Sequence, residues 1–193
     1  MDNKKLALLL GMLCGDGCLV IRTKSKGGYK CYSTDFCNSN IDLITQFQNL
    51  FHELFEIKGN YYPDKRANKK KVVYVFRSYS RDIFDKIADW GFPVGLKKFK
   101  LRIPEIVWSM GREEKLLFLK GFSITDGSIK DSGHIVFHIA SKRFLEDISN
   151  LIYELFELRK PIKEYIQKEK YYSYQLLLNK SEAQEVLSSH LNM

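Results

Sequence analysis

The sequence predicts an α+β protein of two αββαββα repeats, related by a pseudo-twofold axis, in which antiparallel sheets form a saddle. Three observations support this fold: a nonapeptide occurs twice, the same order of elements follows each copy, and each copy lies in a strongly apolar helix. The chain has 193 residues, 45% of them hydrophobic, which is enough for one shared core. We place the first repeat at residues 1–91, a connecting segment at 92–112 and the second repeat at 113–193.

The nonapeptides are the strongest sign of an internal repeat. Residues 9–17 read LLGMLCGDG and residues 119–127 read LKGFSITDG, so that glycine, aspartate and glycine coincide. A single Gly-Asp-Gly after an apolar helix is more often a turn than a functional site. Two copies in register, each followed by similar segments, favour a duplicated unit.

The elements of the first repeat follow from its periodicity. Residues 18–24 and 29–38 alternate around a glycine turn and predict a hairpin. Residues 40–56 have helical apolar spacing, residues 60–66 and 72–78 predict a second hairpin, and residues 81–90 predict a helix.

The second repeat shows the same order. Residues 128–130 and 134–140 predict a hairpin, 142–158 a helix, 162–169 and 171–179 a second hairpin, and 181–190 a last helix. Both opening helices are so apolar that they require burial against a comparable surface. We therefore expect them to pack on each other.

Small residues on the opening helices indicate how they pack. Gly11 and Gly15 are four residues apart and share a helix face, and Gly121 and Thr125 are the corresponding pair. Small residues at this spacing allow two helix backbones to approach closely. The C-terminal ends of the two helices are then expected to lie side by side.

This packing brings together Asp16 and Asp126, which precede Gly17 and Gly127 at the two helix ends. An acidic group at the negative end of a helix dipole is disfavoured by about 0.3–1 kcal/mol. A divalent cation would relieve this conflict, and carboxylate and carbonyl oxygens are the ligands that Mg²⁺ prefers.

The charge distribution points to a phosphate-bearing partner. The formal net charge is +8, and the first hundred residues hold 18 basic and 10 acidic side chains, against 13 and 13 in the remainder. Such an excess favours nucleic acid first and an anionic membrane surface second. A membrane-surface protein would need a basic amphipathic helix, whereas the basic residues lie on the predicted hairpins. No apolar run approaches the roughly 20 residues of a membrane span.

The cysteines indicate a reducing environment. Cys14, Cys18, Cys31 and Cys37 all lie near the N-terminus, which is a poor disulfide framework for this length. Their spacing does not match a zinc site. We expect small, buried or half-buried residues in an intracellular protein, from a prokaryotic cytoplasm or an organelle.

The duplicated nonapeptide, the repeat order and the segment KLRIPEI at 100–106 resemble the LAGLIDADG homing endonucleases, in their single-chain form with two motifs. The resemblance covers nearly the whole chain. It implies a monomeric, site-specific endonuclease that cleaves both strands of a long, pseudo-palindromic DNA target in intron homing. It also implies Mg²⁺ as cofactor, with Mn²⁺ or Ca²⁺ able to substitute for binding.

The resemblance also assigns roles to individual residues. It implies that Asp16 and Asp126 bind the catalytic metals, with the carbonyls of Gly15 and Thr125 as additional ligands. Two metals would activate a water and stabilise the leaving 3′ oxygen.

Further catalytic residues follow from the same resemblance. The family places a polar residue at the end of the first hairpin, where the first half has Asn38 and the second half has Ala140. It places a basic residue after the second hairpin, for which Arg81 or Arg77 and Lys180 are the candidates. The loss of the polar residue in one half predicts unequal cleavage of the two DNA strands.

The hairpins are the expected DNA-reading surface, because a twisted β-ribbon fits the major groove and alternate residues share one face. In the second half, Ile135, Phe137 and Ile139 are expected to face the core. The first-half residues expected on DNA are Arg22, Lys24, Lys26, Lys30, Tyr32, Thr34, Lys65, Arg66, Lys69, Lys70, Lys71 and Arg77. The second-half residues are Lys130, His134, His138, Lys163, Tyr165, Gln167, Lys170 and Gln175.

Two alternatives remain open at this stage. The chain is either the nuclease or a non-cleaving nucleic-acid binder on the same scaffold, such as a maturase of its host intron RNA or a DNA-binding regulator. His134 and His138 form either a metal pair or, since further ligands are missing from the pattern, two polar residues of a sheet face.

Overall fold

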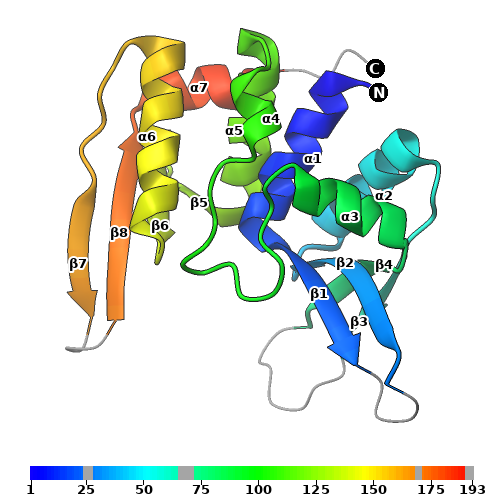
Figure 1. Ribbon diagram of the computed structural model, residues 1–193. Helices are drawn as coiled ribbons and strands as arrows, with labels where there is room; N and C mark the ends of the chain where they lie inside the picture. Colours follow the sequence, from blue (N-terminus) through cyan, green and yellow to red (C-terminus); the bar gives the residue numbers. More distant parts are fainter. Residues whose placement is uncertain (24–27, 65–71, 168–170, 190–193) are drawn as a thin grey trace.

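A computed structural model describes residues 1–23, 28–64, 72–167 and 171–189. It confirms the predicted α+β fold, with two αββαββα units joined by a connection (Figure 1). The first unit consists of α1 (Asn3–Asp16), β1 (Gly17–Thr23), β2 (Lys30–Asn38), α2 (Ile41–Phe55), β3 (Asn60–Pro63), β4 (Tyr74–Ser78) and α3 (Arg81–Asp89). The second consists of α5 (Arg112–Asp126), β5 (Gly127–Ile129), β6 (Ile135–Ile139), α6 (Lys142–Phe156), β7 (Lys163–Gln167), β8 (Tyr171–Leu178) and α7 (Lys180–Ser188). The connection contains a short helix, α4 (Glu105–Trp108), which the sequence pattern did not predict.

The two sheets have the same topology and register. Their strand orders are β1-β2-β4-β3 and β5-β6-β8-β7, with every pair antiparallel. Phe36 of β2 pairs with Gly17 and Phe76, and Phe137 of β6 pairs with Gly127 and Leu176. Phe36 and Phe137 are therefore equivalent positions, and this equivalence allows the two halves to be compared residue by residue.

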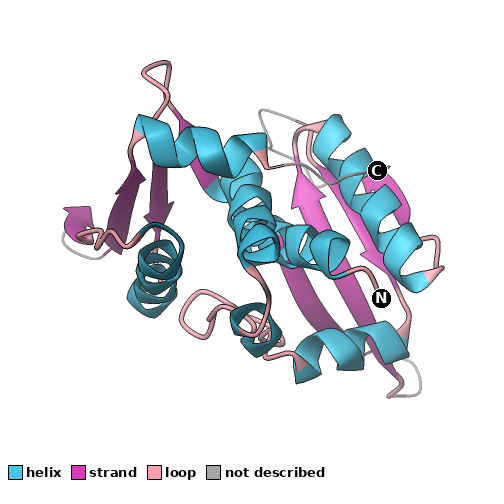
Figure 2. Ribbon diagram, turned by 90° about the horizontal axis from the view of Figure 1, so that it is seen from above, coloured by secondary structure: helices cyan, strands magenta, loops and turns pink. Residues whose placement is uncertain are grey.

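The centre of the fold is the contact between α1 and α5, which lie side by side between the two sheets (Figures 1 and 2). A Cβ atom on Gly121 would lie 2.3 Å from the Leu8 carbonyl oxygen and 2.9 Å from the Met12 amide nitrogen. A Cβ atom on Gly11 would lie 2.1 Å from the Phe118 carbonyl oxygen. Real side chains do not fit at these distances, so the predicted close approach of the helix backbones is confirmed.

Aromatic rings join each sheet to its helices. Phe36 stacks on Phe47 of α2 with ring centroids 4.3 Å apart, and both rings are fully buried. In the second half, Phe137 stacks on Phe122 of α5 at 4.9 Å. Helices thus cover one face of each sheet, and the other face stays open.

The phase of β2 corrects two expectations. Thr34 is fully buried on the helix-covered face, opposite Leu19 and Ser78, and its hydroxyl has no hydrogen-bond partner within the described part of the chain. Tyr32 lies on the same face, with its ring centroid 5.2 Å from that of Phe84 in α3. The prediction that Tyr32 and Thr34 face DNA is therefore wrong. The register through Phe36 places Tyr32 and Thr34 on the helix-covered side of β2, although both side chains carry a hydroxyl group.

The phase of the second sheet is as expected. Ile135 and Phe137 are fully buried, whereas His138 between Phe137 and Ile139 is exposed. His138 pairs with Gln175, which in turn pairs with Lys163. These three side chains therefore share the open face.

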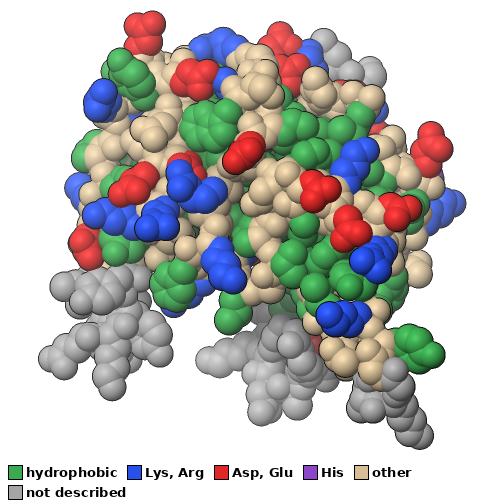
Figure 3. Space-filling model, viewed as in Figure 1, with side chains coloured by type: hydrophobic (Ala, Val, Ile, Leu, Met, Phe, Trp, Pro, Cys, Tyr) green, Lys and Arg blue, Asp and Glu red, His purple; other side chains and the backbone are tan. Residues whose placement is uncertain are grey.

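Several further expectations concern the chain as a whole. All four cysteines are free, with Cys14 buried and the other three half-buried, as predicted. Over the described stretches, none of the helices combines the length and apolar character that a membrane crossing demands. Acidic and basic side chains are interspersed over the helical part of the face in Figure 3.

Candidate catalytic site and nucleic-acid interface

Asp16 and Asp126 are the last residues of α1 and α5, and the packing of these helices brings the two ends together. A Cβ atom on Gly15 would lie 2.0 Å from Thr125 Oγ1 and 3.5 Å from the Asp126 amide nitrogen. The end of each helix therefore contacts the end of the other. This is the juxtaposition that the two nonapeptides predicted.

The Asp16 carboxyl is half-buried and has one hydrogen-bond donor among the described side chains. Asn38 at the end of β2 donates from Nδ2 to Asp16 Oδ2 over 2.7 Å. Burial, and then repulsion from the Asp126 carboxylate, raise the pKa of Asp16 to about 6, while Asn38 and Lys97 oppose the shift. A carboxyl in this state favours a nearby cation.

Asp126 is the more exposed of the two residues. Partial desolvation nevertheless raises the pKa of its carboxyl above the usual value, and the Lys97 ammonium opposes the shift. The charge of Lys97 therefore lowers the pKa of both carboxyl groups. A positive charge between or beside the two carboxylates would stabilise their ionised forms.

Lys97 supplies part of that charge, and the sequence analysis missed it. Its ammonium donates to the Cys14 carbonyl over 2.9 Å, to the Leu13 carbonyl over 3.3 Å and also to the Gly15 carbonyl. These acceptors are carbonyls of the last turn of α1, at its negative end, where a cation is favoured. Burial lowers the pKa of Lys97, while Cys14 and the two aspartates act in the opposite direction.

The position of Lys97 is fixed by the connecting segment. The Gly95 amide donates to the Leu19 carbonyl over 2.8 Å, and Val94 forms a parallel bridge with Leu19 of β1. The lysine pair at residues 97 and 98, followed by Lys100, is a sequence signal for this role. We did not predict a role for these lysines, because residues 92–112 were interpreted as a connecting segment.

The basic residues proposed for catalysis lie elsewhere. Arg81 ion-pairs with Asp85 over 3.3 Å, and its guanidinium carbon lies 4.5 Å from the ring centroid of Tyr32. The Lys180 stem lies beside the β5–β6 turn, where a Cβ atom on Gly133 would be 3.0 Å from Lys180 Cγ. Lys97, by contrast, contacts the helix that carries Asp16.

The structural equivalent of Asn38 in the second half is Ile139, not Ala140. Asn38 is two residues after Phe36, and Ile139 is two residues after the equivalent Phe137. Ile139 carries no polar atom in its side chain, so the expectation that this half lacks the polar residue stands. Only Asp16 of the two aspartates has an amide partner among the described side chains.

The open face of the first sheet carries two arginines around one acid. Arg77 donates to both Asp35 carboxylate oxygens over 2.9 and 2.6 Å, and Arg22 donates to Asp35 over 2.8 Å and to Ser33 over 2.5 Å. Burial alone would raise the pKa of Asp35, but the hydrogen bonds from Arg77 and Arg22 outweigh it and hold the pKa below its usual value. The cluster keeps a net positive charge and fixes both guanidinium groups.

The open face of the second sheet carries a different set of polar groups. Tyr165 donates its hydroxyl to Gln175 Oε1 over 2.6 Å, and Gln175 Nε2 lies 3.2 Å from His138 Nε2. His134 Nδ1 lies 2.9 Å from Ser132 Oγ, whereas His138 lies against Gln175, so the two imidazoles have different polar neighbours. Lys130 and Lys163 are exposed.

Not every DNA-binding expectation falls on described residues. Lys30 begins β2 and is exposed, and Gln167 ends β7, where it pairs with Tyr171. The remaining candidates lie outside the described residues: Lys24, Lys26, Lys65, Arg66, Lys69, Lys70, Lys71 and Lys170.

The donor set at the helix ends fits a hard divalent cation. It offers the carboxylates of Asp16 and Asp126 and the carbonyls of Gly15 and Thr125. An ammonium group already lies against the Gly15 carbonyl, which shows that this oxygen accepts positive charge. In the described part of the chain no three His, Cys, Asp or Glu side chains cluster, so a metal here depends on backbone oxygens as well.

The paired acidic helices and the two sheets of the same register define a duplicated α+β protein with two helices packed at its centre. A sequence model of the LAGLIDADG-like domain matches residues 113–191, which identifies the second repeat directly. The whole chain has the fold of the LAGLIDADG homing endonucleases.

Solved structures support this assignment. A mesophilic variant of the homing endonuclease I-DmoI has a TM-score of 0.73 and 21% identity, with 99% of this chain and 100% of that chain covered. I-DmoI in complex with DNA and Ca has a TM-score of 0.72 and 22% identity, covering 97% and 91%. The homing endonuclease I-WcaI bound to its DNA recognition sequence has a TM-score of 0.63 and 18% identity, covering 97% and 80%. A search of curated protein sequences gives no match to this chain.

Proposed function

We propose that this protein is a site-specific endonuclease that hydrolyses both strands of a long DNA target with the help of divalent metal, Mg²⁺ in the first place. The observation that carries the proposal is the pairing of Asp16 and Asp126 at adjoining helix ends, with Asn38 and Lys97 beside them. The neighbouring I-DmoI structures contain DNA with Ca or Mn, or target DNA with Mg, which supports both partners.

In this mechanism, Asp16 and Asp126 bind the cation together with the carbonyls of Gly15 and Thr125. When bound, divalent metal supplies Lewis-acid chemistry that activates water and stabilises the leaving 3′ oxygen. Asn38 orients the Asp16 carboxylate through its 2.7 Å hydrogen bond. Lys97 places a positive charge beside the scissile phosphate, where negative charge grows in the transition state.

The two repeats divide the target between them. The open face of each sheet contacts one half-site in the major groove, with Arg22 and Arg77 in the first half and Lys130, His138 and Lys163 in the second. Since one chain supplies both aspartates, the active form is a monomer.

The test is cleavage of a target recovered from a randomised duplex library. The wild-type chain is expected to cut the recovered duplex with Mg²⁺ and not with EDTA. Asp16→Asn and Asp126→Asn are expected to bind the duplex without cutting it, and Asp131→Asn, an exposed turn residue, serves as the matched control. Sequence-specific binding without cleavage by the wild-type chain would instead support the non-cleaving alternative, a DNA-binding regulator or an intron RNA maturase.

A further inference from the structure

The open face of the second sheet holds a polar cluster of three side chains from three adjacent strands. Gln175 of β8 lies between His138 of β6 and Tyr165 of β7. Its Oε1 accepts from the Tyr165 hydroxyl over 2.6 Å, and its Nε2 lies 3.2 Å from His138 Nε2. The rings of His138 and Tyr165 are 6.2 Å apart and lie on either side of the amide. The cluster is separate from the catalytic carboxylates.

These contacts fix the orientation of the Gln175 amide. A glutamine amide has two acceptor lone pairs and two donor hydrogens. Tyr165 uses one lone pair, and His138 uses one hydrogen when its Nε2 is the unprotonated ring nitrogen. One acceptor and one donor therefore remain, on a side chain whose rotamer is already held.

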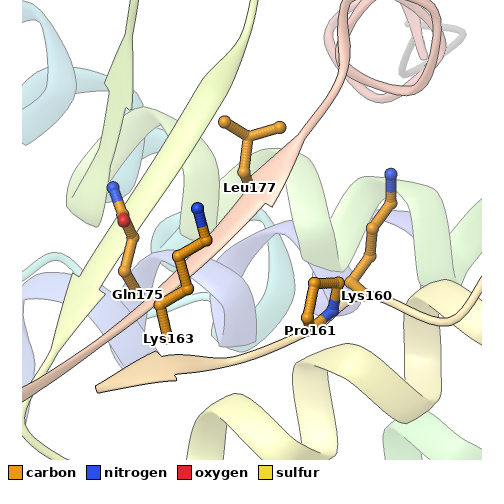
Figure 4. A pocket seen from close by; sticks show the side chains of 5 residues that line it. All are labelled: Lys160, Pro161, Lys163, Gln175 and Leu177. Carbon is orange, nitrogen blue, oxygen red and sulfur yellow. The ribbon is translucent and has the colours of Figure 1, made fainter.

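The surroundings of the amide form a shallow hollow on this face. Figure 4 shows Gln175, Lys163 and Leu177 extending to the same side of β7 and β8. The hollow has a volume of about 220 Å³, and Leu177 within it is 43% exposed. Leu177 is two residues from Gln175 on the same strand, which corresponds to about 7 Å.

We propose that this hollow reads an A·T-containing step of the target, with the Gln175 amide bound to adenine N6 and N7 in the major groove. Adenine is the base that presents one donor and one acceptor side by side on this edge, which matches the two unused groups of the amide. The exposed Leu177 supplies an apolar surface for a thymine methyl group next to it. Lys163, opposite Gln175 in the register, adds positive charge toward the backbone.

This inference rests on the proposed function, because it concerns the target of the same protein. Tyr165 and His138 act in it as positioning residues, since they orient Gln175 and need not contact the base. Preorganisation of this kind reduces the ordering cost of recognition.

The experiment is selection of bound duplexes from a randomised library in Ca²⁺, followed by sequencing, with the full chain as wild type and Gln175→Glu. The wild type is expected to show an adenine preference at one position of the second half-site. Gln175→Glu is expected to replace it with cytosine, because a carboxylate accepts from cytosine N4, and to lose about tenfold in affinity for the adenine-containing target. Gln184→Glu on the exposed side of α7 makes the same chemical change away from this face and is expected to keep the wild-type preferences.

Tyr165→Phe tests the positioning role. It removes the hydroxyl that holds Gln175 and is expected to weaken discrimination at that one position, with the other positions of the target unchanged.

A chain that selects and cleaves a target, with identical base preferences in wild type and Gln175→Glu, would overturn the inference and leave the proposed function standing. A chain that selects no sequence at all would overturn both.

Discussion

The Lys97 ammonium donates to the carbonyl of Gly15, the residue that precedes Asp16, the proposed metal ligand of the first repeat. A residue of the connection between repeats thereby contacts the end of the first helix, more than 80 positions earlier in the chain. The contact neutralises the negative end of the helix dipole beside two carboxylates. The connection is therefore part of the site and not only a link between two halves.

Lys97→Met is expected to slow cleavage by about 10²-fold, because it removes a fixed positive charge from the place where the phosphate gains negative charge. Binding of the target duplex, measured by filter retention, is expected to change little, since the hairpins supply the contacts. Lys100→Met removes an exposed lysine of the same segment and serves as the control. Equal cleavage rates for Lys97→Met and the wild type would show that the lysine only caps the helix.

The close contact between α1 and α5 predicts that a glycine-to-alanine substitution inside it destabilises the protein far more than one at the start of α5. Gly121→Ala would place a methyl group 2.3 Å from the Leu8 carbonyl, on backbone that cannot turn aside. We expect a loss of about 2–3 kcal/mol in the free energy of unfolding, measured in urea. Gly111 is the N-cap of the same helix, and a Cβ atom there would meet only the flexible Glu114 side chain, at 2.8 Å. Gly111→Ala is therefore expected to cost no more than about 1 kcal/mol, from the loss of a favoured N-cap residue. Similar losses for the two variants would argue against the tight helix contact.

The cluster around Asp35 predicts a dependence of stability on pH. Since the folded-state pKa of Asp35 is lower than its unfolded value of 3.8, its contribution is present above that value and is lost as pH falls through the folded pKa. Asp35→Asn is expected to destabilise the protein near neutral pH by about 1–3 kcal/mol, because Arg77 and Arg22 lose their partner. In urea unfolding, the gap between variant and wild type should narrow below pH 4 or so. Parallel stability curves from pH 7 into acid would contradict the assignment, and Asp131→Asn provides the curve for an exposed acid.

The repeat carried most of the fold prediction. Two copies of one nonapeptide, each with small residues four apart, were sufficient to predict the helix contact, the common order of elements in the two halves and the meeting of Asp16 with Asp126. These features depend on local spacing and on symmetry, both of which are visible in a sequence.

The positions of the residues that we predicted wrongly or missed depend on strand register and on tertiary contacts, which local sequence patterns do not specify. Thr34 is polar and Val20 is apolar, yet Thr34 lies in the core and Val20 on the open face. The hairpin register through Phe36 decides this, and one position of shift reverses every side chain of a strand. Lys97 acts on Gly15 through a tertiary contact, so no spacing within the connection specifies its partner.

The difference between Asn38 and Ile139 predicts unequal cleavage of the two strands. Asn38 holds the Asp16 carboxylate, whereas Ile139 at the equivalent position offers Asp126 no hydrogen bond. A supercoiled plasmid with the target is expected to pass through a nicked intermediate. Asn38→Ala should slow the faster strand and reduce the difference, and Asn49→Ala on α2 serves as the exposed control. Simultaneous cleavage of both strands by the wild type would count against this asymmetry.

The charge excess of the first half predicts how binding responds to salt. Of the 31 basic residues, the first hundred positions hold 18, with 10 acidic residues, while the later positions are balanced at 13 and 13. Each phosphate contact releases counterions, so the slope of log affinity against log salt counts such contacts. Neutralising Lys24, Lys26 and Lys30 together is therefore expected to flatten this slope by about 2–3, and neutralising Lys163, Lys168 and Lys170 to flatten it less. The two triplets remove equal charge, one from the first repeat and one from the second, so each is the control for the other. Equal changes in slope would mean that the additional basic residues of the first repeat do not contact phosphates of the target.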